Sequence, residues 1–321
     1  RRVIVVRRLL QNRGALATGP NPGINAAMND SRRLPPEAIA TQLLLCMIWG
    51  LGQVATKVGN AGISPIWQAA LRSIGAALLL TAWIAWRRIP LGDRSQTLVP
   101  GIVAGVLFGL EFVFLFVGLV YTTAVRAVLL LYSAPFFVAL GAHFFVPGDR
   151  LTRNKLVGLA AAFAGLLLAF ADRVTLPDSR VLIGDLLCLG AAFMWGATTI
   201  VIKATALRRA PPEATLLYQL AISAPLMVAL SYAFGEPGVF APTALVWAAL
   251  AFQTIVIAWA SYTAWFWLVS RYRATTLHAF TFLTPLFGVL AGALLLGEPV
   301  SPAIVGALAL IATGIVLVNR A

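Results

Sequence analysis

The sequence contains few charged residues. Asp, Glu, Lys and Arg make up 11% of its 321 residues, whereas 60% of the residues are hydrophobic. So little polar surface cannot cover so much apolar surface, which excludes an ordinary soluble domain and favours a protein embedded in a bilayer.

Cysteine and histidine are also scarce, with two of each. Cys46 and Cys188 lie inside apolar stretches, so no disulfide framework is indicated. His143 and His278 have no carboxylate or thiol at ligand spacing. We therefore expect neither a metal site nor a cofactor.

The motifs of soluble enzymes are missing too. The sequence has no P-loop and no Gly-x-Ser-x-Gly elbow, so ATP hydrolysis by this chain is excluded and we do not expect an enzyme. An intramembrane enzyme acting on lipid or peptide is an alternative from another class. It would need a nucleophile and a base at one depth, and neither His143 nor His278 has an evident serine and acid beside it.

Apolar segments follow one another from Ile39 onward, with short polar breaks between them. A spanning helix needs roughly 20 apolar residues, whereas a membrane strand needs only about 10. The lengths therefore predict an all-α membrane protein. We expect ten transmembrane helices, at about residues 39–57, 65–86, 98–120, 124–146, 154–171, 181–202, 213–234, 244–269, 274–296 and 301–319.

The net charge of +13 does not indicate a nucleic-acid partner, because the cations follow the membrane. Cationic residues accumulate in cytoplasmic loops. One set of alternate loops is rich in them, and the other holds little beyond Arg173 and Arg180. We therefore expect a bacterial inner-membrane protein with both termini in the cytoplasm. The rich set contains the N-terminal tail, Arg87, Arg88, Arg94, Arg150, Arg153, Lys155, Arg208, Arg209, Arg271, Arg273 and Arg320.

Residues 1–37 are basic and precede the first apolar segment. We expect a disordered cytoplasmic tail near anionic headgroups. The chain begins without methionine, and Met28 is a second candidate for the start of translation.

Two stretches of the sequence follow one pattern. Pro135 and Pro285 each interrupt an apolar segment, and an acidic turn follows, Pro147-Gly148-Asp149 in one stretch and Gly297-Glu298-Pro299 in the other. A glycine-spaced apolar segment comes next in both, with Gly158 and Gly165 or Gly306 and Gly314. The repetition indicates an internal duplication.

A second pair of signatures gives the size of the repeat. Trp49-Gly50 precedes Lys57, and Trp195-Gly196 precedes Lys203, with a spacing of eight from tryptophan to lysine in both. The repeat therefore has five helices, and we expect one copy in residues 38–172 and the other in 173–321. Because five is odd, the copies must have opposite orientations, a recurrent plan of secondary transporters that bind substrate near the midplane.

Together these signatures resemble the EamA family of the drug/metabolite transporter superfamily. The resemblance covers about residues 39–320. It implies ten helices, inverted repeats and a central cavity drawn mainly from helices one, three, four, six, eight and nine. It does not specify the substrate, since the family moves amino acids, other metabolites and drugs, often outward.

Charged residues inside predicted spans need an explanation, because each is costly there. Glu111 is the only acid deep in a span, and Ser261 is its counterpart in the second half. Glu111 could couple transport to protons or bind a cationic substrate group; alternatively, it is a protonated carboxyl bonded to a neighbouring helix. Arg72, whose counterpart is Gln219, and Arg126 are candidates for a gate or for binding a substrate carboxylate, or else they snorkel to the interface.

The remaining polar candidates have weaker signals. Lys57 and Lys203 lie near span ends, where an interfacial anchor is the favoured reading. His143 and His278 could titrate near neutral pH or be packed in the core. His278, just inside the ninth span, is kept as a cavity candidate.

Aromatic residues supply the other cavity candidates, Trp49, Tyr132, Trp195 and Tyr262. Pro135 and Pro285 each remove a backbone donor at membrane depth, so these paired interruptions are candidate hinges or static bends. Gly101, Gly105 and Gly109 form a smooth strip for helix packing, either within the chain or between protomers. A monomer and a homodimer both fit.

The sequence thus predicts a secondary transporter of a small metabolite, an amino acid or a drug-like amphiphile, working by alternating access and directed outward. Export driven by the solute gradient and coupling to protons are both open. The alternatives are a proton-coupled uptake permease and a membrane scaffold without transport activity.

Overall fold

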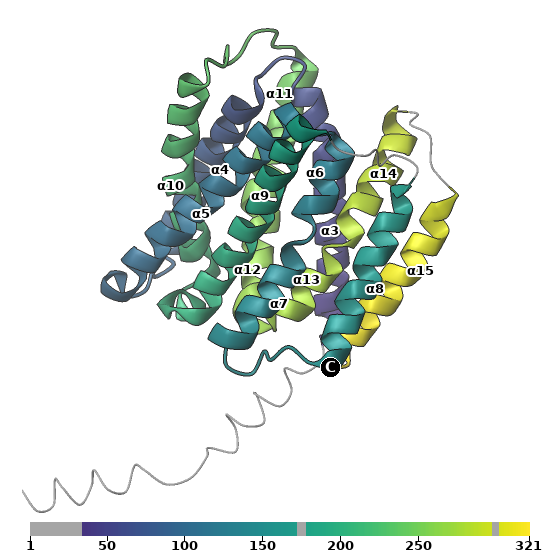
Figure 1. Ribbon diagram of the computed structural model, residues 1–321. Helices are drawn as coiled ribbons and strands as arrows, with labels where there is room; N and C mark the ends of the chain where they lie inside the picture. The colour runs from purple at the N-terminus through teal and green to yellow at the C-terminus, as the bar shows by residue number, and fades with distance from the viewer. Residues whose placement is uncertain (1–33, 172–177, 297–301) are drawn as a thin grey trace, which may run out of the picture. The chain divides into compact units, whose positions relative to one another are not determined.

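The computed structural model describes residues 34–171, 178–296 and 302–321. Within these ranges the regular structure is helical, apart from one antiparallel bridge between Ile63 and Val239. Residues 34–321 form one compact unit (Figure 1). The predicted tail, except for its last four residues, and the Gly297-Glu298-Pro299 turn lie outside the described residues.

The helices agree closely with the apolar segments of the sequence. Eight helical stretches of the described residues are long and apolar enough to cross a membrane, and Ala303–Asn319 is a shorter apolar helix. The first half contains α3 (Pro36–Gly59), α4 (Pro65–Arg87), α5 (Arg94–Tyr121), α6 (Ala124–Leu131), α7 (Ala134–Phe145) and α8 (Arg153–Ala169). The second contains α9 (Ser179–Ala204), η2 (Ala206–Arg209), α10 (Pro212–Ala233), α11 (Ala244–Phe252), the π-helix η3 (Gln253–Ser261), α12 (Tyr262–Arg271), α13 (Ala274–Phe280), α14 (Leu283–Leu296) and α15 (Ala303–Asn319).

The two segments that contain Pro135 and Pro285 are interrupted helices. Pro135 occupies the first turn of α7, where its missing N–H would have had no helical partner. Ser133 turns the chain there, since its Oγ donates to the carbonyl of Leu130 at 2.6 Å. In the second half, Thr281 Oγ1 donates to His278 O at 2.7 Å, and α14 begins at Leu283, two residues before Pro285. The interruptions predicted from the prolines are therefore present.

Side chains from loops fix several helix starts. Asp93, Thr123, Thr152, Asp178 and Thr243 each accept a hydrogen bond from a backbone N–H of the helix that follows. The start of α4 is capped by a residue far away in the sequence. The Glu236 carboxylate accepts hydrogen bonds from the N–H groups of Ile66 at 3.0 Å and Trp67 at 2.9 Å.

The repeated Trp-Gly motif lies where helices approach closely. A Cβ on Gly50 would be 2.7 Å from the backbone nitrogen of Gly288 in α14, and a Cβ on Gly196 would be 2.8 Å from Cβ of Phe137 in α7. Glycine is needed at both positions because any side chain would push the helices apart. The α3–α14 and α9–α7 contacts thus use matching positions of the two halves.

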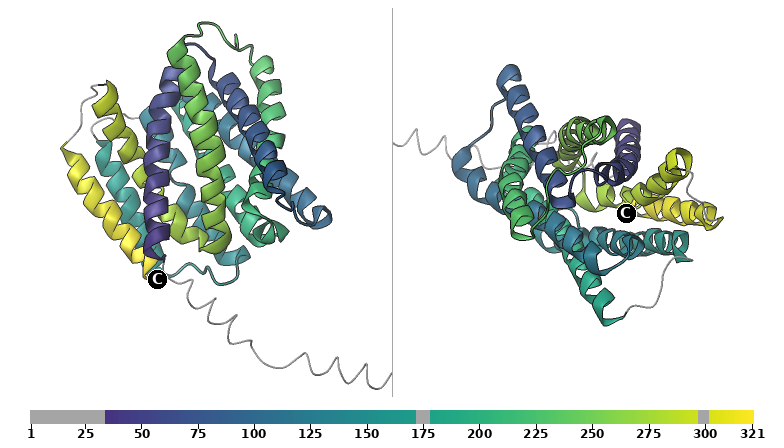
Figure 2. Two further views of the ribbon diagram at one scale, coloured as in Figure 1. Left: turned by 180° about the vertical axis from the view of Figure 1, so that it is seen from behind. Right: turned by 90° about the horizontal axis from the view of Figure 1, so that it is seen from above.

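Other glycines settle packing that the sequence left open. Gly101, Gly105 and Gly109 of α5 face Tyr218, Ile222 and Leu226 of α10, so this strip packs within the chain. Helices α8 and α15 lie side by side (Figure 2). They touch at their glycines, since a Cβ on Gly158 would be 2.6 Å from the carbonyl oxygen of Gly314.

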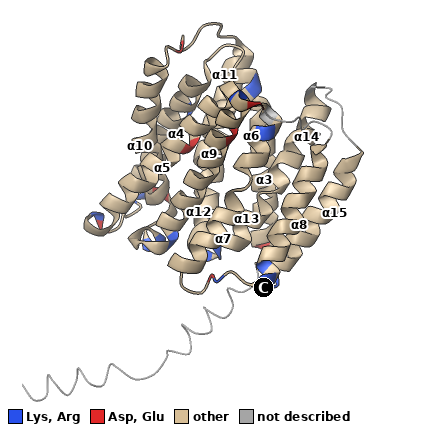
Figure 3. Cartoon of the chain, in the orientation of Figure 1, with Lys and Arg blue, Asp and Glu red and all other residues tan. Residues whose placement is uncertain are grey.

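The interrupted helices run in different directions through the bundle. In Figure 1 the chain descends from α6 to α7 and rises from α13 to α14. Charged residues gather toward the ends of the helices, and few lie between (Figure 3).

Candidate functional site

A cavity of about 640 Å³ lies inside the helix bundle. Its lining comes from both halves of the chain and is mostly apolar and aromatic, with a small set of polar side chains. The apolar and aromatic lining residues are Trp49, Phe108, Phe112, Leu115, Phe116, Leu119, Ala127, Val128, Leu131, Tyr132, Trp195, Ile257, Tyr262, Trp265 and Phe266. The polar ones are Gln53, Thr56, Lys57, Asn60, Arg72, Glu111, Thr198, Thr199, Gln219 and Gln253.

The two ends of the cavity differ. Toward the ends of α3 and α5 its lining includes Lys57, Asn60 and Leu119, which are exposed. At the other end it stops at Trp265 and Phe266, which are 4% and 7% exposed. The cavity therefore reaches exposed residues at Lys57 and Asn60, whereas the aromatic floor formed by Trp265 and Phe266 is buried.

His278 lies behind this floor. It is fully buried, its ring packs against Trp195 and Trp265 with centroid distances of 5.4 and 5.1 Å, and its Nε2 is 3.0 Å from Oγ1 of Thr199. His278, a cavity candidate from the sequence, is not among the residues that line this cavity. The rings of Trp195 and Trp265 cover the imidazole. The other residues of the short helix α13 are buried as well.

Polar contacts hold the chain together beyond the floor. Lys203 Nζ donates to the carbonyl oxygens of Val269 at 2.7 Å and Tyr272 at 2.8 Å, at the end of α12. Lys155 Nζ lies 2.7 Å from Asp149 Oδ1, and the other oxygen of Asp149 accepts from the N–H of Thr275 at 3.1 Å. These contacts tie the first-half turn before α8 to the start of α13 in the second half.

A guanidinium and a carboxyl group line the cavity without pairing with each other. Arg72 and Glu111 are each 8% exposed, and no ion pair joins them among the described residues. Within the described chain, Arg72 Nε and Nη2 and Glu111 Oε2 have no hydrogen-bond partner. The guanidinium lies over the Phe112 ring, 4.6 Å from its centroid. Gln219, the counterpart of Arg72, is fully buried beside the same cavity.

One wall of the cavity carries a network of amides. Gln253, in the π-helical turn of η3, donates from Nε2 to Oε1 of Gln68 at 2.6 Å, and Gln68 donates to Asn60 Oδ1 at 2.5 Å. Thr56 Oγ1 donates to Gln253 Oε1 at 3.3 Å. This network joins α3, α4 and η3. Sequence reasoning missed it, although Gln253 is one of the few polar residues of the predicted eighth span.

Aromatic side chains of the lining contact one another and a neighbouring hydroxyl. Trp49 Nε1 donates to Oγ of Ser261 at 2.9 Å, and the Trp49 ring meets the edges of Tyr262 and Trp265. Tyr132 packs edge-on against Trp195, with centroids 5.8 Å apart. The four aromatic residues predicted for the cavity, Trp49, Tyr132, Trp195 and Tyr262, all line it, as do Arg72 and Glu111.

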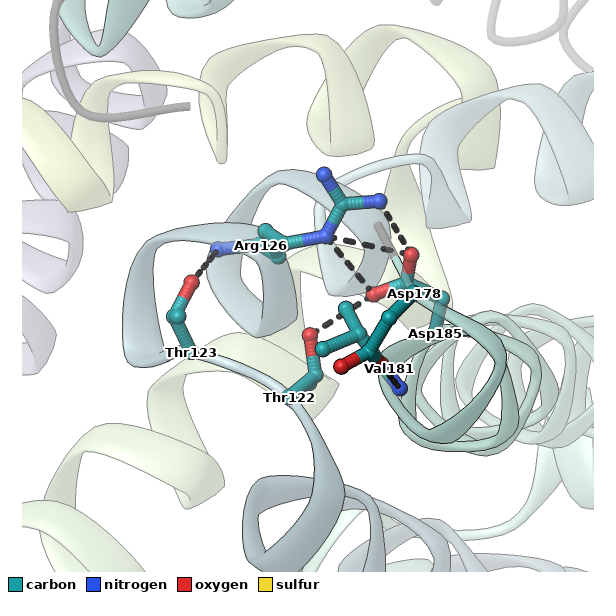
Figure 4. A network of polar contacts seen from close by, with 6 residues as sticks. All are labelled: Thr122, Thr123, Arg126, Asp178, Val181 and Asp185. Carbon is teal, nitrogen blue, oxygen red and sulfur yellow. Dashed lines mark hydrogen bonds and ion pairs between the residues drawn. The ribbon is translucent and has the colours of Figure 1, made fainter. Parts of the chain in front are cut away.

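Arg126 has a different position from the one proposed for a substrate-binding arginine. Its Nε lies 3.1 Å from both carboxylate oxygens of Asp185 in α9, and Thr122 Oγ1 donates to Oδ1 of Asp185 at 2.7 Å (Figure 4). Arg126 is not among the cavity lining residues. A carboxylate of the chain therefore already binds its guanidinium. Sequence reasoning missed Asp185 as the partner of Arg126. The available signal was an acidic residue near the start of the predicted sixth span.

In the described part of the chain, no group of three or more His, Cys, Asp or Glu side chains lies close enough to hold a metal ion.

Comparison with known proteins identifies the family. The sequence model of the EamA-like transporter family matches residues 37–171 and 182–320. The chain belongs to the EamA-like transporter family. A transporter of Archaeoglobus fulgidus, described as uncharacterized, is 30% identical over 257 residues, which cover 77% of this chain and 86% of that protein.

Other relatives have more specific descriptions. A protein of Salmonella typhimurium described as a "Probable amino-acid metabolite efflux pump" is 30% identical and is aligned over 80% of this chain and 86% of its own length. A solved crystal structure at 22% identity covers 88% of this chain and 98% of its own chain with a TM-score of 0.76, which shows the shared fold. This EamA-like transporter is therefore a multi-pass membrane protein with a general role in transport rather than catalysis.

Proposed function

We propose that this EamA-like transporter is a secondary transporter that exports a small, partly apolar metabolite, such as an amino acid or a drug-like amphiphile, by alternating access. The observation that carries the proposal is the cavity. It lies between helices of both halves, reaches exposed residues at one end and stops at a buried aromatic floor at the other.

The proposed architecture is ten transmembrane helices in two five-helix copies of opposite orientation, residues 38–172 and 173–321. The family match to two separate segments supports the duplication. The matching close approaches at Gly50 and Gly196 support a symmetric relation between the copies. The opposite courses of α6–α7 and α13–α14 support the inversion.

The arginine-rich loops support cytoplasmic termini. With that orientation the exposed end of the cavity faces outward, and the contacts of Lys203 and of Asp149 with Lys155 and Thr275 close the cytoplasmic side. Access from the cytoplasm requires these contacts to open. The interruptions before Pro135 and Pro285 are the proposed hinges, since kinked backbone has fewer helical bonds to break.

The outward direction rests on relatives. Two of them, from Salmonella typhimurium and Escherichia coli, are described as probable amino-acid metabolite efflux pumps. The solute gradient or protons would supply the driving force, and Glu111 is the candidate proton carrier. A proton-coupled uptake permease is the second candidate, favoured only by the placement of Glu111 in the cavity.

Counterflow in proteoliposomes tests the proposal. The reconstituted transporter, preloaded with unlabelled amino acid, should accumulate the labelled compound with saturable kinetics. A scaffold would show no saturable exchange. Glu111→Gln should abolish any dependence of flux on a pH gradient if this carboxyl carries protons, and unchanged proton dependence would remove that role.

A further inference from the structure

Arg72 and Glu111 are both buried and line one cavity, and no ion pair joins them among the described residues. We infer that the cavity selects zwitterions, with the solute carboxylate bound by Arg72 and its ammonium group bound by Glu111. The inference deepens the proposed function, on which it rests for the bound solute being the transported one.

The hydrogen-bonding state of the two side chains is the first argument. Both are 8% exposed and line the same cavity, yet in the described chain Arg72 Nε and Nη2 and Glu111 Oε2 lack any hydrogen-bond partner. Arg72 rests on the Phe112 ring instead, 4.6 Å from its centroid. Such groups are strongly disfavoured when buried unless a partner reaches them.

Elsewhere in this chain buried charges do find partners. Lys155 pairs with Asp149 and Arg126 pairs with Asp185, each with further hydrogen bonds. Arg72 and Glu111 are placed on different helices, α4 and α5, with both side chains facing the cavity between them. A solute in this cavity can therefore contact both side chains.

Charge balance decides which solute fits. A zwitterion brings no net charge and supplies an anion for Arg72 and a cation for Glu111. A cation lacking the carboxylate leaves Arg72 without a partner, and an anion lacking the ammonium group leaves Glu111 without one. Either defect leaves a charge buried and unpaired, which costs binding strongly.

Two further features suit an amino compound with an apolar body. Gln219 lies beside the cavity with Oε1 unpartnered in the described chain, and its Nε2 already donates to Thr215 O at 3.2 Å, so the free oxygen can accept from an ammonium group. Trp49, Phe108 and Tyr262 provide an apolar surface, and the volume of about 640 Å³ is sufficient for a small amphiphile.

Binding to the purified full-length transporter in nanodiscs tests the inference. The probes are alanine, leucine and phenylalanine, each compared with the amine lacking its carboxylate and the acid lacking its ammonium group. Isothermal titration should show that the best zwitterion binds at least about 30-fold more tightly than either counterpart, as expected for one unsatisfied buried charge.

Variants then separate the two charges. Arg72→Gln should reduce the preference for the zwitterion over the amine to within about 3-fold while retaining its preference over the acid, and Glu111→Gln should do the reverse. Arg94→Gln is the matched control, because it removes an exposed cation at the start of α5 that does not line the cavity, and it should preserve both preferences. A misfolded variant would lose both preferences, so it cannot produce the loss of one preference with retention of the other.

Three results would overturn the inference: amines or acids that bind the wild-type protein as tightly as the zwitterions, variants that weaken all probes equally, or no binding of any zwitterion in the panel. The proposed function is tested separately, by counterflow. Charge-selective binding without counterflow refutes transport but keeps the zwitterion site, whereas counterflow without charge selectivity keeps transport and refutes the site.

Discussion

The ammonium group of Lys155 lies 2.7 Å from Oδ1 of Asp149, and both residues are 1% exposed. Lys155 also donates to the carbonyl of Arg150 at 2.8 Å, and Asp149 accepts from the N–H of Thr275. This pair therefore connects the acidic turn of the first half to a helix start of the second. The acidic turn at Asp149 therefore has a structural role.

Lys155→Met should destabilise the protein by about 3–5 kcal/mol, because it leaves the Asp149 carboxylate buried without its cation. The double variant with Asp149→Leu should be less destabilised than the sum of the single variants. Thermal unfolding in detergent measures both effects.

Arg153→Met is the control for the lysine substitution. Arg153 lies two residues away at the start of the same helix and is exposed, so its loss should change the free energy of unfolding little. Equal effects of Lys155→Met and Arg153→Met would contradict a role for the buried pair.

Gly50→Ala should lower stability by about 1–3 kcal/mol and reduce transport, because the new Cβ would lie 2.7 Å from the backbone of Gly288 and force α3 away from α14. Gly306→Ala is the matched control, since its Cβ would meet only the end of the Leu168 side chain, at 3.2 Å. The unfolding temperatures of the two variants in detergent provide the comparison. A Gly50→Ala protein as stable as Gly306→Ala would show that the close approach is unnecessary.

Much of this arrangement could be predicted from the sequence. Apolar segment lengths gave the helices, and Pro135 and Pro285 marked the interruptions, because both depend on local physics. Six residues line the cavity that the sequence singled out as aromatic or charged residues inside predicted spans: Trp49, Tyr132, Trp195, Tyr262, Glu111 and Arg72.

Contacts between distant segments could not be predicted in this way. Asp185 lies 59 residues from Arg126, and Thr275 lies 126 residues from Asp149, so no helical periodicity relates them. The packing of His278 against Trp195 and Trp265 likewise could not be predicted from its position in the sequence. The π-helical register that directs Gln253 toward Gln68 also has no clear sequence signal.

Trp49→Phe and Ser261→Ala should each destabilise the protein by about 1 kcal/mol, because each removes the 2.9 Å hydrogen bond between the indole and the hydroxyl. The double variant should show a coupling energy of about 0.5–1.5 kcal/mol. A double-mutant cycle in detergent measures it, and strictly additive effects would mean that the bond contributes nothing.

Asp93 should give the start of α5 a pH-dependent stability. Hydrogen bonds from Ser95 hold the pKa of this carboxyl below its ordinary value of 3.8. A lowered pKa in the folded state means that the stabilisation is fully present above about pH 4 and is lost as the pH falls through the folded-state pKa. The difference in unfolding temperature between the wild type and Asp93→Ala should therefore be constant at neutral pH and shrink below pH 3.8. A difference that persists unchanged in acid would contradict this role of the carboxylate.

The sidedness of Thr123 and Arg271 tests the central claim most directly. Both are exposed, and they lie before the first and second interrupted helices, α6 and α13. In a background lacking Cys46 and Cys188, a membrane-impermeant maleimide should label Thr123→Cys in intact cells and Arg271→Cys only after permeabilisation. Labelling of both from the same side would contradict two copies of opposite orientation with a solute cavity between them.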